Sequence, residues 1–500
     1  MVVRNFTKYM FSQFCLENCC LQTSKFKNFS LRRVELSGLG YQYNNNLYTS
    51  IRHCNHPRLT PQEVTTILTA NEFTQEFNGS GSVKSFDSNQ LSSNNPIEDA
   101  RSEGKCLLTS GVLIGVFDGH GGAACAQVVA KRLYNYITVS LLPPDLLKKY
   151  LNSLEQNLND MKLFENINDK YDFVEELKGM YDGSFKKFVK ELSSKNQDFH
   201  MKEVLENAFL QLDKHLSDEA LKKSNNKVNL KTLSVGMSGA VACVAHIDGP
   251  HLHVASLGDC QAVIGVLNDS ETWTAKKVSV EHNTDNQGEV ERILNEHPNN
   301  EKDTVLKMER LLGQLAPLRA FGDFRYKWSR RDLTDVVVPH LGEQALAPNY
   351  YTPPYLTAKP DIIHHRLTPR DRFLVIASDG LWDLISPLQA VRLVGEHMFG
   401  KVTLSPLRLP KKDMKLSEIN DLLIQRQKGL SKKPIDRNAA THLLRHALGG
   451  TEYGIEHSKI AQLLSMPQEV VRLFRDDITI TVVYLDPEYL RHCPPLFLVN

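Results

Sequence analysis

The chain has 500 residues, a length that allows about three domains but also fits one large catalytic domain with insertions. Its 59 Lys and Arg residues balance 58 Asp and Glu residues, so the charge favours neither a nucleic-acid-binding protein nor a protein of membrane surfaces, and no stretch approaches the roughly 18 apolar residues of a membrane span. The nine cysteines show no CxxC pair or regular spacing, which argues against a disulfide framework or a zinc ribbon and favours reduced thiols in an intracellular compartment.

The first 56 residues are basic. Seven Lys or Arg stand against two Glu, and apolar residues recur at helix-like spacing opposite basic ones near the start. An amphipathic, basic, acid-poor segment without a continuous apolar core is typical of an organelle transit peptide, and an ordinary disordered basic tail is the alternative. We therefore predict an organelle transit peptide and flexible leader over residues 1–56.

A buried strand is predicted over residues 112–117, which are apolar and β-branched at nearly every position. Its core ends at Asp118, three closely spaced glycines follow, and helical spacing resumes over residues 123–136. Asp118 and His120 are therefore expected on a strand-to-helix turn. For an isolated Asp-Gly pair, a polar turn with a capping Asp would be the simpler interpretation.

Other segments are predicted from composition. Residues 79–95, rich in Ser, Asn and Gly, indicate a loop or exposed hairpin. Residues 141–224 are expected to be mostly helical, as an insertion or a helical layer. Residues 345–360 contain four prolines and are predicted to be irregular. A basic surface insertion is expected around residues 400–436, followed by a short helix over 438–448 that two glycines would end.

Acidic residues recur at the tips of the predicted strands. Asp259 follows "HLHVASLG", Asp379 follows the apolar run 373–377, and Asp476 directly precedes "DITITVVYL". Together with Asp118 they would repel one another at the mouth of one core, so they require compensating charge.

Hard divalent cations supply such charge, because Mg²⁺ and Mn²⁺ prefer carboxylate, carbonyl and water oxygens. Two such ions about 3.5–4 Å apart can activate a water for attack on phosphorus or a carbonyl carbon. Zinc is less favoured, because the sequence has no HExxH motif and no clustered His and Cys ligands. A Walker loop is also absent, which argues against phosphoryl transfer of that type.

Six motifs carry a resemblance to a known family across roughly residues 98–485. In chain order they are "FDGHGG", "SGAVACVAHI", "LGDCQAVIG", "LRAFGDF", "ASDGLWD" and "RDDITITVV". This order resembles the type-2C metal-dependent protein serine/threonine phosphatases. The resemblance implies an α+β fold, a sandwich of two antiparallel β-sheets flanked by α-helices. It implies a single catalytic domain over residues 57–490, with helical insertions and a tail over 491–500.

The resemblance also implies a centre of two Mg²⁺ or Mn²⁺ ions. Asp118 would bridge both ions, and the carbonyl of Gly119 would bind one of them. Asp379 and Asp476 would complete the other, and Glu98 would act on a metal through water. A hydroxide bridging the ions would attack the phosphoserine directly, without a phosphoenzyme.

Further roles follow from the same resemblance. Asp259 and Asp383 match positions of a weaker third divalent ion, and His120 would be the general acid. Many members of the family carry a phosphate-binding Arg where this sequence has Asn94. That role cannot be transferred. Arg101 lies close by and could take it, although a surface salt bridge is the simpler interpretation for this residue.

Three other acids have lesser expected roles. Asp99 is expected close to the metals but not on them. Asp477 is a candidate neighbour of the ligands rather than a ligand. Asp323 is as suited to holding a loop together as to touching metal.

Four connecting stretches resemble the mitochondrial members that act on pyruvate dehydrogenase: "FDSNQLSSNNPIEDARSE", "PLRAFGDFRYKWS", "YYTPPYLTAKP" and "RNAATHLLRHALGGTEYG". This implies a mitochondrial matrix enzyme that dephosphorylates and so reactivates the pyruvate dehydrogenase E1 alpha subunit. It also implies docking on the lipoyl domain of the dihydrolipoyl acetyltransferase core. The sequence leaves open the paralogue, an effect of Ca²⁺ on docking, the oligomeric state and the presence of a regulatory subunit.

Two other functions are alternatives. A non-catalytic regulatory protein, or pseudophosphatase, would keep the sandwich for binding and lose the strand-tip acids, which are all present here. A two-metal phosphodiesterase or nuclease commonly recruits histidine ligands and, for nucleic acid, a basic cleft. The balanced charge disfavours the nuclease.

Overall fold

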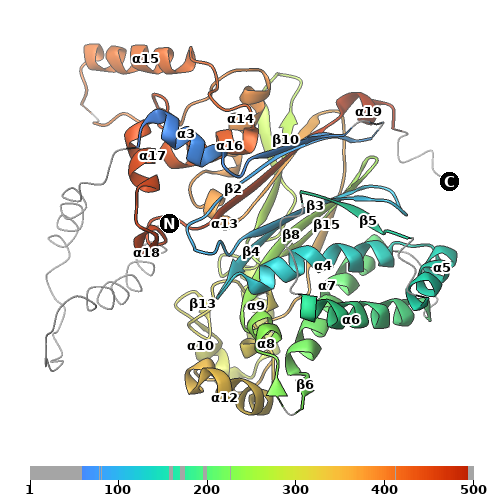
Figure 1. Ribbon diagram of the computed structural model, residues 1–500. Helices are drawn as coiled ribbons and strands as arrows, with labels where there is room; N and C mark the ends of the chain where they lie inside the picture. Colours follow the sequence, from blue (N-terminus) through green and yellow to red (C-terminus); the bar gives the residue numbers. More distant parts are fainter. Residues whose placement is uncertain are drawn as a thin grey trace, which may run out of the picture.

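The structure is a computed structural model that describes residues 59–493, apart from 78, 80, 157–160, 169–174, 195–199, 226 and 412. The predicted leader and all of the predicted tail beyond residue 493 lie outside the described residues. Two antiparallel sheets pack against each other, and helices cover their outer faces (Figure 1). The predicted fold class is confirmed.

Each sheet is built from strands far apart in the chain, and every neighbouring pair is antiparallel. The first sheet has the order β1 (Phe73–Glu76), β2 (Val83–Leu91), β17 (Ile478–Leu485), β16 (Asp371–Ala377), β10 (Gln261–Leu267), β11 (Trp273–Lys277). The second has the order β15 (Asp361–Arg366), β9 (His251–Leu257), β8 (Gly239–Asp248), β4 (Val112–His120), β3 (Ala100–Cys106), β5 (Phe164–Ile167), with β14 (Phe321–Gly322) also pairing with β8.

Helices cover both outer faces (Figure 1). On the second sheet, or beside it, lie α4 (Ala124–Ser140), α5 (Pro144–Glu155), α6 (Glu175–Ser193), α7 (Met201–Leu221) and α8 (Leu230–Met237). On the first sheet lie α3 (Pro61–Thr69), α14 (Pro387–Met398), α16 (Ala439–Gly449) and α17 (His457–Leu464). The remaining helices are α9 (Gln287–Glu296), α10 (Lys302–Val305), α11 (Arg330–Asp332), α12 (Val338–Leu341), α13 (Asp379–Trp382), α15 (Leu416–Leu430), α18 (Gln468–Val471) and α19 (Pro487–Arg491). Short two-residue ladders join β6 (Lys223–Ser224) to β7 (Lys227–Val228) and β12 (Leu306–Lys307) to β13 (Arg310–Leu311).

The central strands are apolar on both faces because the sandwich buries both. In β16, Leu374 and Ile376 belong to the core between the sheets, whereas Val375 and Ala377 belong to the core under α14 and α16. Alternate residues of a strand point to opposite faces, so a continuous apolar run fills both cores at once. Such runs are most familiar from parallel sheets, and here an antiparallel sheet covered by helices has the same requirement.

Residues 79–95 do not form the loop or exposed hairpin that their composition predicts, because most of them form the interior strand β2. The polar side chains of residues 87–90 in β2 are buried and hydrogen-bonded. Asp87 accepts from the backbone N–H of Ala439 at 2.8 Å, and Asn89 donates to the hydroxyl of Thr441 at 2.8 Å. Both partners lie in α16, so the polar strand is stabilised by a helix more than 350 positions away in sequence.

The strand that begins at Val112 is longer than predicted. It continues as β4 to His120, and Asp118, Gly119 and His120 pair with β8 instead of lying on the turn. The turn comes at Gly121 and Gly122, whose φ angles of +67° and +121° lie in the left-handed region that favours glycine.

The other predicted segments agree with the structure. Residues 141–224 are mostly helical, although β5 from this region extends the second sheet. Residues 346–360 form no helix or strand beyond an isolated bridge, and α15 is an exposed helix within the basic region. The predicted helix after residue 438 is α16, with Asn438 as its N-cap. Of the helices in the part of the chain that is described, none is both long and apolar enough to cross a membrane.

Helix α16 contains two buried histidines whose rings pack, tilted, beside each other and beside a third histidine from α14. The His442 ring centroid lies 4.7 Å from that of His397 and 4.3 Å from that of His446. Nε2 of His442 has no hydrogen-bond partner. Burial, reinforced by neighbouring cations, lowers the pKa of His442 to about 2, and burial lowers the pKa of His446 to about 4.

We predict that this cluster makes the fold sensitive to acid. The folded chain binds fewer protons at these histidines than the unfolded chain, so stability is full above pH 6.5 and falls as the pH drops below it. Each of the two groups should cost about 2 kcal/mol of unfolding free energy at pH 5. Urea unfolding at pH 8 and pH 5 should show a smaller acid loss for His442→Leu than for the wild type. The exposed His492 provides the control variant His492→Leu, and an equal acid loss in all three proteins would contradict the prediction.

Candidate metal centre

The predicted strand-tip carboxylates come together at one end of the sandwich. Asp118 lies near the end of β4, Asp379 opens α13 directly after β16, and Asp476 precedes β17. Burial raises the pKa of Asp118 well above its usual range, and four other carboxylates raise it further. These belong to Asp99, Asp379, Asp259 and Asp476. The sequence prediction of a shared acidic cluster agrees with this arrangement.

Asp99 is held by protein hydroxyls. Its Oδ2 accepts hydrogen bonds from Ser378 Oγ at 2.9 Å and from Thr479 Oγ1 at 2.7 Å. Burial, together with the charge of Asp477, raises the pKa of Asp99 to about 8. Asp99 therefore connects the ends of β16 and β17 beneath the cluster.

Asp477 is engaged by the loop that precedes β3. Its Oδ1 accepts from the backbone N–H groups of Ser93 and Asn94, the second at 2.9 Å. Its Oδ2 accepts from Asn94 Nδ2 at 2.9 Å and from the N–H of Glu98 at 2.8 Å. This carboxylate therefore positions the segment that contains Glu98, in keeping with its interpretation as a neighbour of the ligands.

Glu98 lies between the glycine turn and an arginine. Its Oε1 accepts from the N–H of Gly122 at 2.7 Å, and its Oε2 accepts from Nη1 of Arg472 at 2.7 Å. The backbone carbonyl of Glu98 also lies against Gly119, where a Cβ atom would come within 2.2 Å of it. Glycine is therefore required at position 119 by this close approach within the strand, and not by a turn as the sequence suggested.

His120 forms an ion pair with Asp323, and its Nε2 lies 2.5 Å from Oδ2 of that residue. Burial alone would lower the pKa of His120, but the carboxylate of Asp323 raises it above its usual value, with smaller contributions from Asp259 and Glu98. The imidazole is therefore favoured in its protonated form. The backbone of Asp323 has a φ of +51°, and its N–H donates to the carbonyl of Ser238 at 3.0 Å.

The cluster suits hard cations that retain water. Within the described ranges, no three His, Cys, Asp or Glu side chains already converge on a single position suited to an ion. Mg²⁺ is commonly held by only one or two carboxylates, with waters completing its octahedron, so such convergence is not required. Asp118 is buried among four other carboxylates, so added positive charge would be stabilising there.

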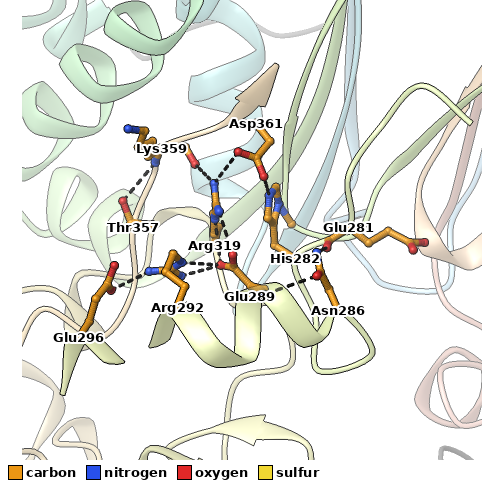
Figure 2. Close-up of polar contacts among 11 residues, drawn as sticks. Glu281, His282, Asn286, Glu289, Arg292, Glu296, Arg319, Thr357, Lys359 and Asp361 are labelled. Atoms are coloured by element: carbon orange, nitrogen blue, oxygen red, sulfur yellow. Dashed lines mark hydrogen bonds and ion pairs between the residues drawn. The ribbon is translucent and has the colours of Figure 1, made fainter. Parts of the chain in front are cut away.

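The loop that contains Asp259 is held by a separate polar network (Figure 2). The N–H of Gly258 donates to Nδ1 of His282 at 3.1 Å, and Nε2 of His282 lies 3.0 Å from Asp361. Arg319 forms two 2.8 Å hydrogen bonds with Glu289 and lies 3.4 Å from Asp361 (Figure 2). Sequence reasoning gave Arg319 no role, because its partner lies 30 positions away on α9.

The positions of Asp383 and Arg101 bear on their predicted roles. Burial raises the pKa of Asp259, and the charge of the Asp383 carboxylate raises it further. The two residues predicted to bind the third metal are therefore near each other. Arg101 is 5% exposed and pairs with Glu103 at 2.6 Å. This pair is buried in β3 rather than on the surface, and no hydrogen bond joins Arg101 to Asn94 or Glu98.

Comparisons with known proteins place the chain among phosphatases. The family described as Protein phosphatase 2C matches residues 152–417. Mitochondrial pyruvate dehydrogenase (acetyl-transferring) phosphatase 1 from Bos taurus is 44% identical over 447 residues, covering 85% of this chain and 82% of that protein. Mitochondrial pyruvate dehydrogenase (acetyl-transferring) phosphatase 2 from Homo sapiens is 39% identical over 453 residues, covering 87% of this chain and 84% of that protein. A serine-threonine phosphatase 2C crystal structure from Toxoplasma gondii is 17% identical, with a TM-score of 0.41, covering 83% of this chain and 99% of that one.

The chain belongs to the protein phosphatase 2C family, whose members are metal-dependent protein serine/threonine phosphatases. The predicted resemblance and the predicted phosphatase class are therefore confirmed. The family match over 152–417 includes Asp259, Asp379 and Asp383, whereas Asp118 and Asp476 lie outside that range.

We predict that Asp323→Asn lowers the pKa of His120, because the substitution removes the carboxylate that favours the imidazolium. Titration of ¹³C-labelled histidine by NMR would measure the change. Asp371→Asn removes the carboxylate from a second His–Asp pair, in which His365 Nε2 lies 3.1 Å from Asp371, and should leave His120 unaffected. An unchanged His120 titration in Asp323→Asn would contradict the prediction.

Proposed function

We propose that the protein dephosphorylates phosphoserine on the E1 alpha subunit of pyruvate dehydrogenase and thereby reactivates it. The main support is the 44% identity, over 85% of this chain, to a protein named as a mitochondrial pyruvate dehydrogenase phosphatase. The acidic cluster at the mouth of the sandwich supports the same reaction, because transfer of a phosphoryl group depends chiefly on positioning and on neutralising charge.

We further propose that the cluster holds two Mg²⁺ or Mn²⁺ ions and a weaker third ion. When bound, the cations would neutralise phosphate oxygens and activate a water. The proposed ligands of the first two ions are Asp118, the carbonyl of Gly119, Asp379, Asp476 and, through water, Glu98. The proposed ligands of the third ion are Asp259 and Asp383.

His120 is the proposed general acid. Its Nε2 is engaged by Asp323, so the transferable proton would lie on Nδ1 of the imidazolium. That proton would pass to the serine oxygen as the phosphorus–oxygen bond breaks, because a serine alkoxide is a poor leaving group. Asp99 and Asp477 would keep the surrounding strand ends and the Glu98 loop in place.

We expect purified protein to release phosphate from phosphorylated pyruvate dehydrogenase E1 alpha in the presence of Mg²⁺ or Mn²⁺ and not after chelation. Phosphate release would be measured beside phosphoserine peptides, nucleotides and DNA, which also tests the phosphodiesterase alternative. Activity on none of the phosphoproteins or peptides would favour the non-catalytic alternative instead.

Two variants separate the proposed roles. Asp118→Asn removes the charge proposed to bridge two cations, so metal affinity and activity should both collapse on every substrate. His120→Gln should keep the metals and lose activity on phosphoserine protein by about 10²–10⁴-fold. Its loss on p-nitrophenyl phosphate should be far smaller, because nitrophenolate leaves as a stable anion. Equal losses on both substrates with metal still bound would leave His120 as a positioning residue.

We also propose a mitochondrial matrix location, with residues 1–56 as the transit peptide and residues 57–490 as the catalytic domain. The named relatives are mitochondrial, and the leader has the composition of an import signal.

Docking on the lipoyl domain of the dihydrolipoyl acetyltransferase core would raise the effective concentration of phosphorylated subunits without new chemistry. The same proposal allows for a regulatory subunit. It also allows for an effect of Ca²⁺ on docking.

Fusion of residues 1–56 to a fluorescent protein should direct the fusion into mitochondria, because the segment is basic, acid-poor and amphipathic. Microscopy with a mitochondrial marker would measure this. A matched fusion with the seven basic residues replaced by Gln is the control and should stay in the cytosol. Diffuse fluorescence from both fusions would count against a transit peptide.

A further inference from the structure

Arg472 places a cation at the rim of the acidic cluster. It follows α18, and its Nη1 donates to Glu98 Oε2 at 2.7 Å and to Asn94 Oδ1 at 2.6 Å. Its side chain is 48% exposed. Partial burial acts to lower the pKa of Arg472, but the charges of Asp476 and Glu98 raise it, so the guanidinium keeps its charge.

Asn94 holds this guanidinium in a fixed place. Its backbone N–H and its Nδ2 both donate to Asp477 at 2.9 Å, and Nδ2 also donates to Glu98 at 3.2 Å. These bonds fix the orientation of the amide and leave Oδ1 as an acceptor. Arg472 donates to this acceptor, so the neutral side chain of Asn94 helps to position the charged side chain of Arg472.

The guanidinium of Arg472 has N–H donors that its two hydrogen bonds do not use. Arg472 uses Nη1 for both of its hydrogen bonds, and no hydrogen bond from Nη2 or Nε to another described residue is present. A guanidinium binds phosphate oxygens through two parallel donors, and it does so more strongly than a neutral amide can. Because the side chain is about half exposed, these donors can be reached by a phosphorylated segment of another protein.

We propose that Arg472 binds the phosphoryl group of the substrate, in place of the arginine that is missing at position 94. The proposal rests on the proposed phosphatase function. Arg475 is the other arginine in this segment, and it is unsuited to the role. It is 8% exposed, and its Nη2 is engaged by the carbonyl of Ser92.

A simpler role for Arg472 would be to neutralise Glu98 and nothing else. The two roles predict different behaviour when the arginine is removed. A neutralising residue competes with cations, so its loss would tighten metal binding and leave phosphate binding unchanged. A phosphate-binding residue would show the reverse, with weaker phosphate binding and little change in metal affinity.

The test measures orthophosphate binding to the full-length protein loaded with Mn²⁺, by isothermal titration calorimetry. Arg472→Gln should weaken orthophosphate binding by about 10- to 100-fold, because a charged hydrogen-bond donor is lost. Arg472→Lys keeps the positive charge but not the two parallel N–H donors, so it should weaken orthophosphate binding less than Arg472→Gln does. Mn²⁺ affinity, followed by electron paramagnetic resonance, should be unchanged in both variants.

Arg491→Gln is the matched control. Arg491 is 59% exposed and pairs with Glu488 at 2.7 Å, so it resembles Arg472 in exposure and pairing but lies on α19. This variant should bind orthophosphate as the wild type does. Orthophosphate binding that is unchanged in Arg472→Gln, or Mn²⁺ binding that becomes tighter with no loss of phosphate binding, would overturn the proposal.

Kinetics with two substrates complete the test. In Arg472→Gln, the KM should rise by a similar factor for phosphoprotein and for p-nitrophenyl phosphate, because both carry the phosphoryl group. A rise for phosphoprotein alone would assign Arg472 to the protein part of the substrate and overturn the proposal. Wild-type protein that binds orthophosphate through Arg472 but releases no phosphate would refute the proposed function and leave the anion site standing.

Discussion

Repulsion among buried carboxylates is the constraint on which this end of the molecule depends. Most of the acids nearby have a partner within the chain: Asp99 has two hydroxyls, Asp477 has backbone and side-chain N–H groups, and Glu98 has Arg472. Asp118 is different, because burial and four neighbouring charges all disfavour its ionised form. The fold therefore supplies partners to several of the surrounding acids and leaves Asp118 buried among like charges, an arrangement that bound cations would stabilise.

The sandwich makes this concentration possible. Both faces of β16 are buried, which leaves little freedom for the strand end from which Asp379 follows. Gly119 lies in regular pairing with β8 and admits the carbonyl of Glu98 at a distance that any side chain would prevent. Rigid strands place the acids close together more accurately than loops would, and the energy of burying apolar surface holds them there against their mutual repulsion.

The sequence predicted what is local in the chain and missed what depends on distant partners. Asp118, Asp379 and Asp476 are candidates from sequence because an acid at the end of an apolar run is visible in a few residues. The composition of β2 predicts a loop, because the partners that satisfy Asp87 and Asn89 lie far away in α16. Patterns of polarity report on local preference, whereas burial of a polar strand depends on hydrogen bonds that only the tertiary structure supplies.

The same limit explains why the role of position 94 could not be settled from sequence. The arginine that contacts Asn94 is 378 positions away, and although Asp476 lies nearby in sequence, no local pattern indicates that Arg472 reaches Asn94. In space, however, Arg472, Asp476 and Asp477 share one short segment before β17. That segment contributes a cation at the rim, an acid of the cluster and the carboxylate that holds the Glu98 loop. The proposed phosphate-binding arginine and a proposed metal ligand therefore lie on one short segment after α18, so a displacement of that segment would move both side chains.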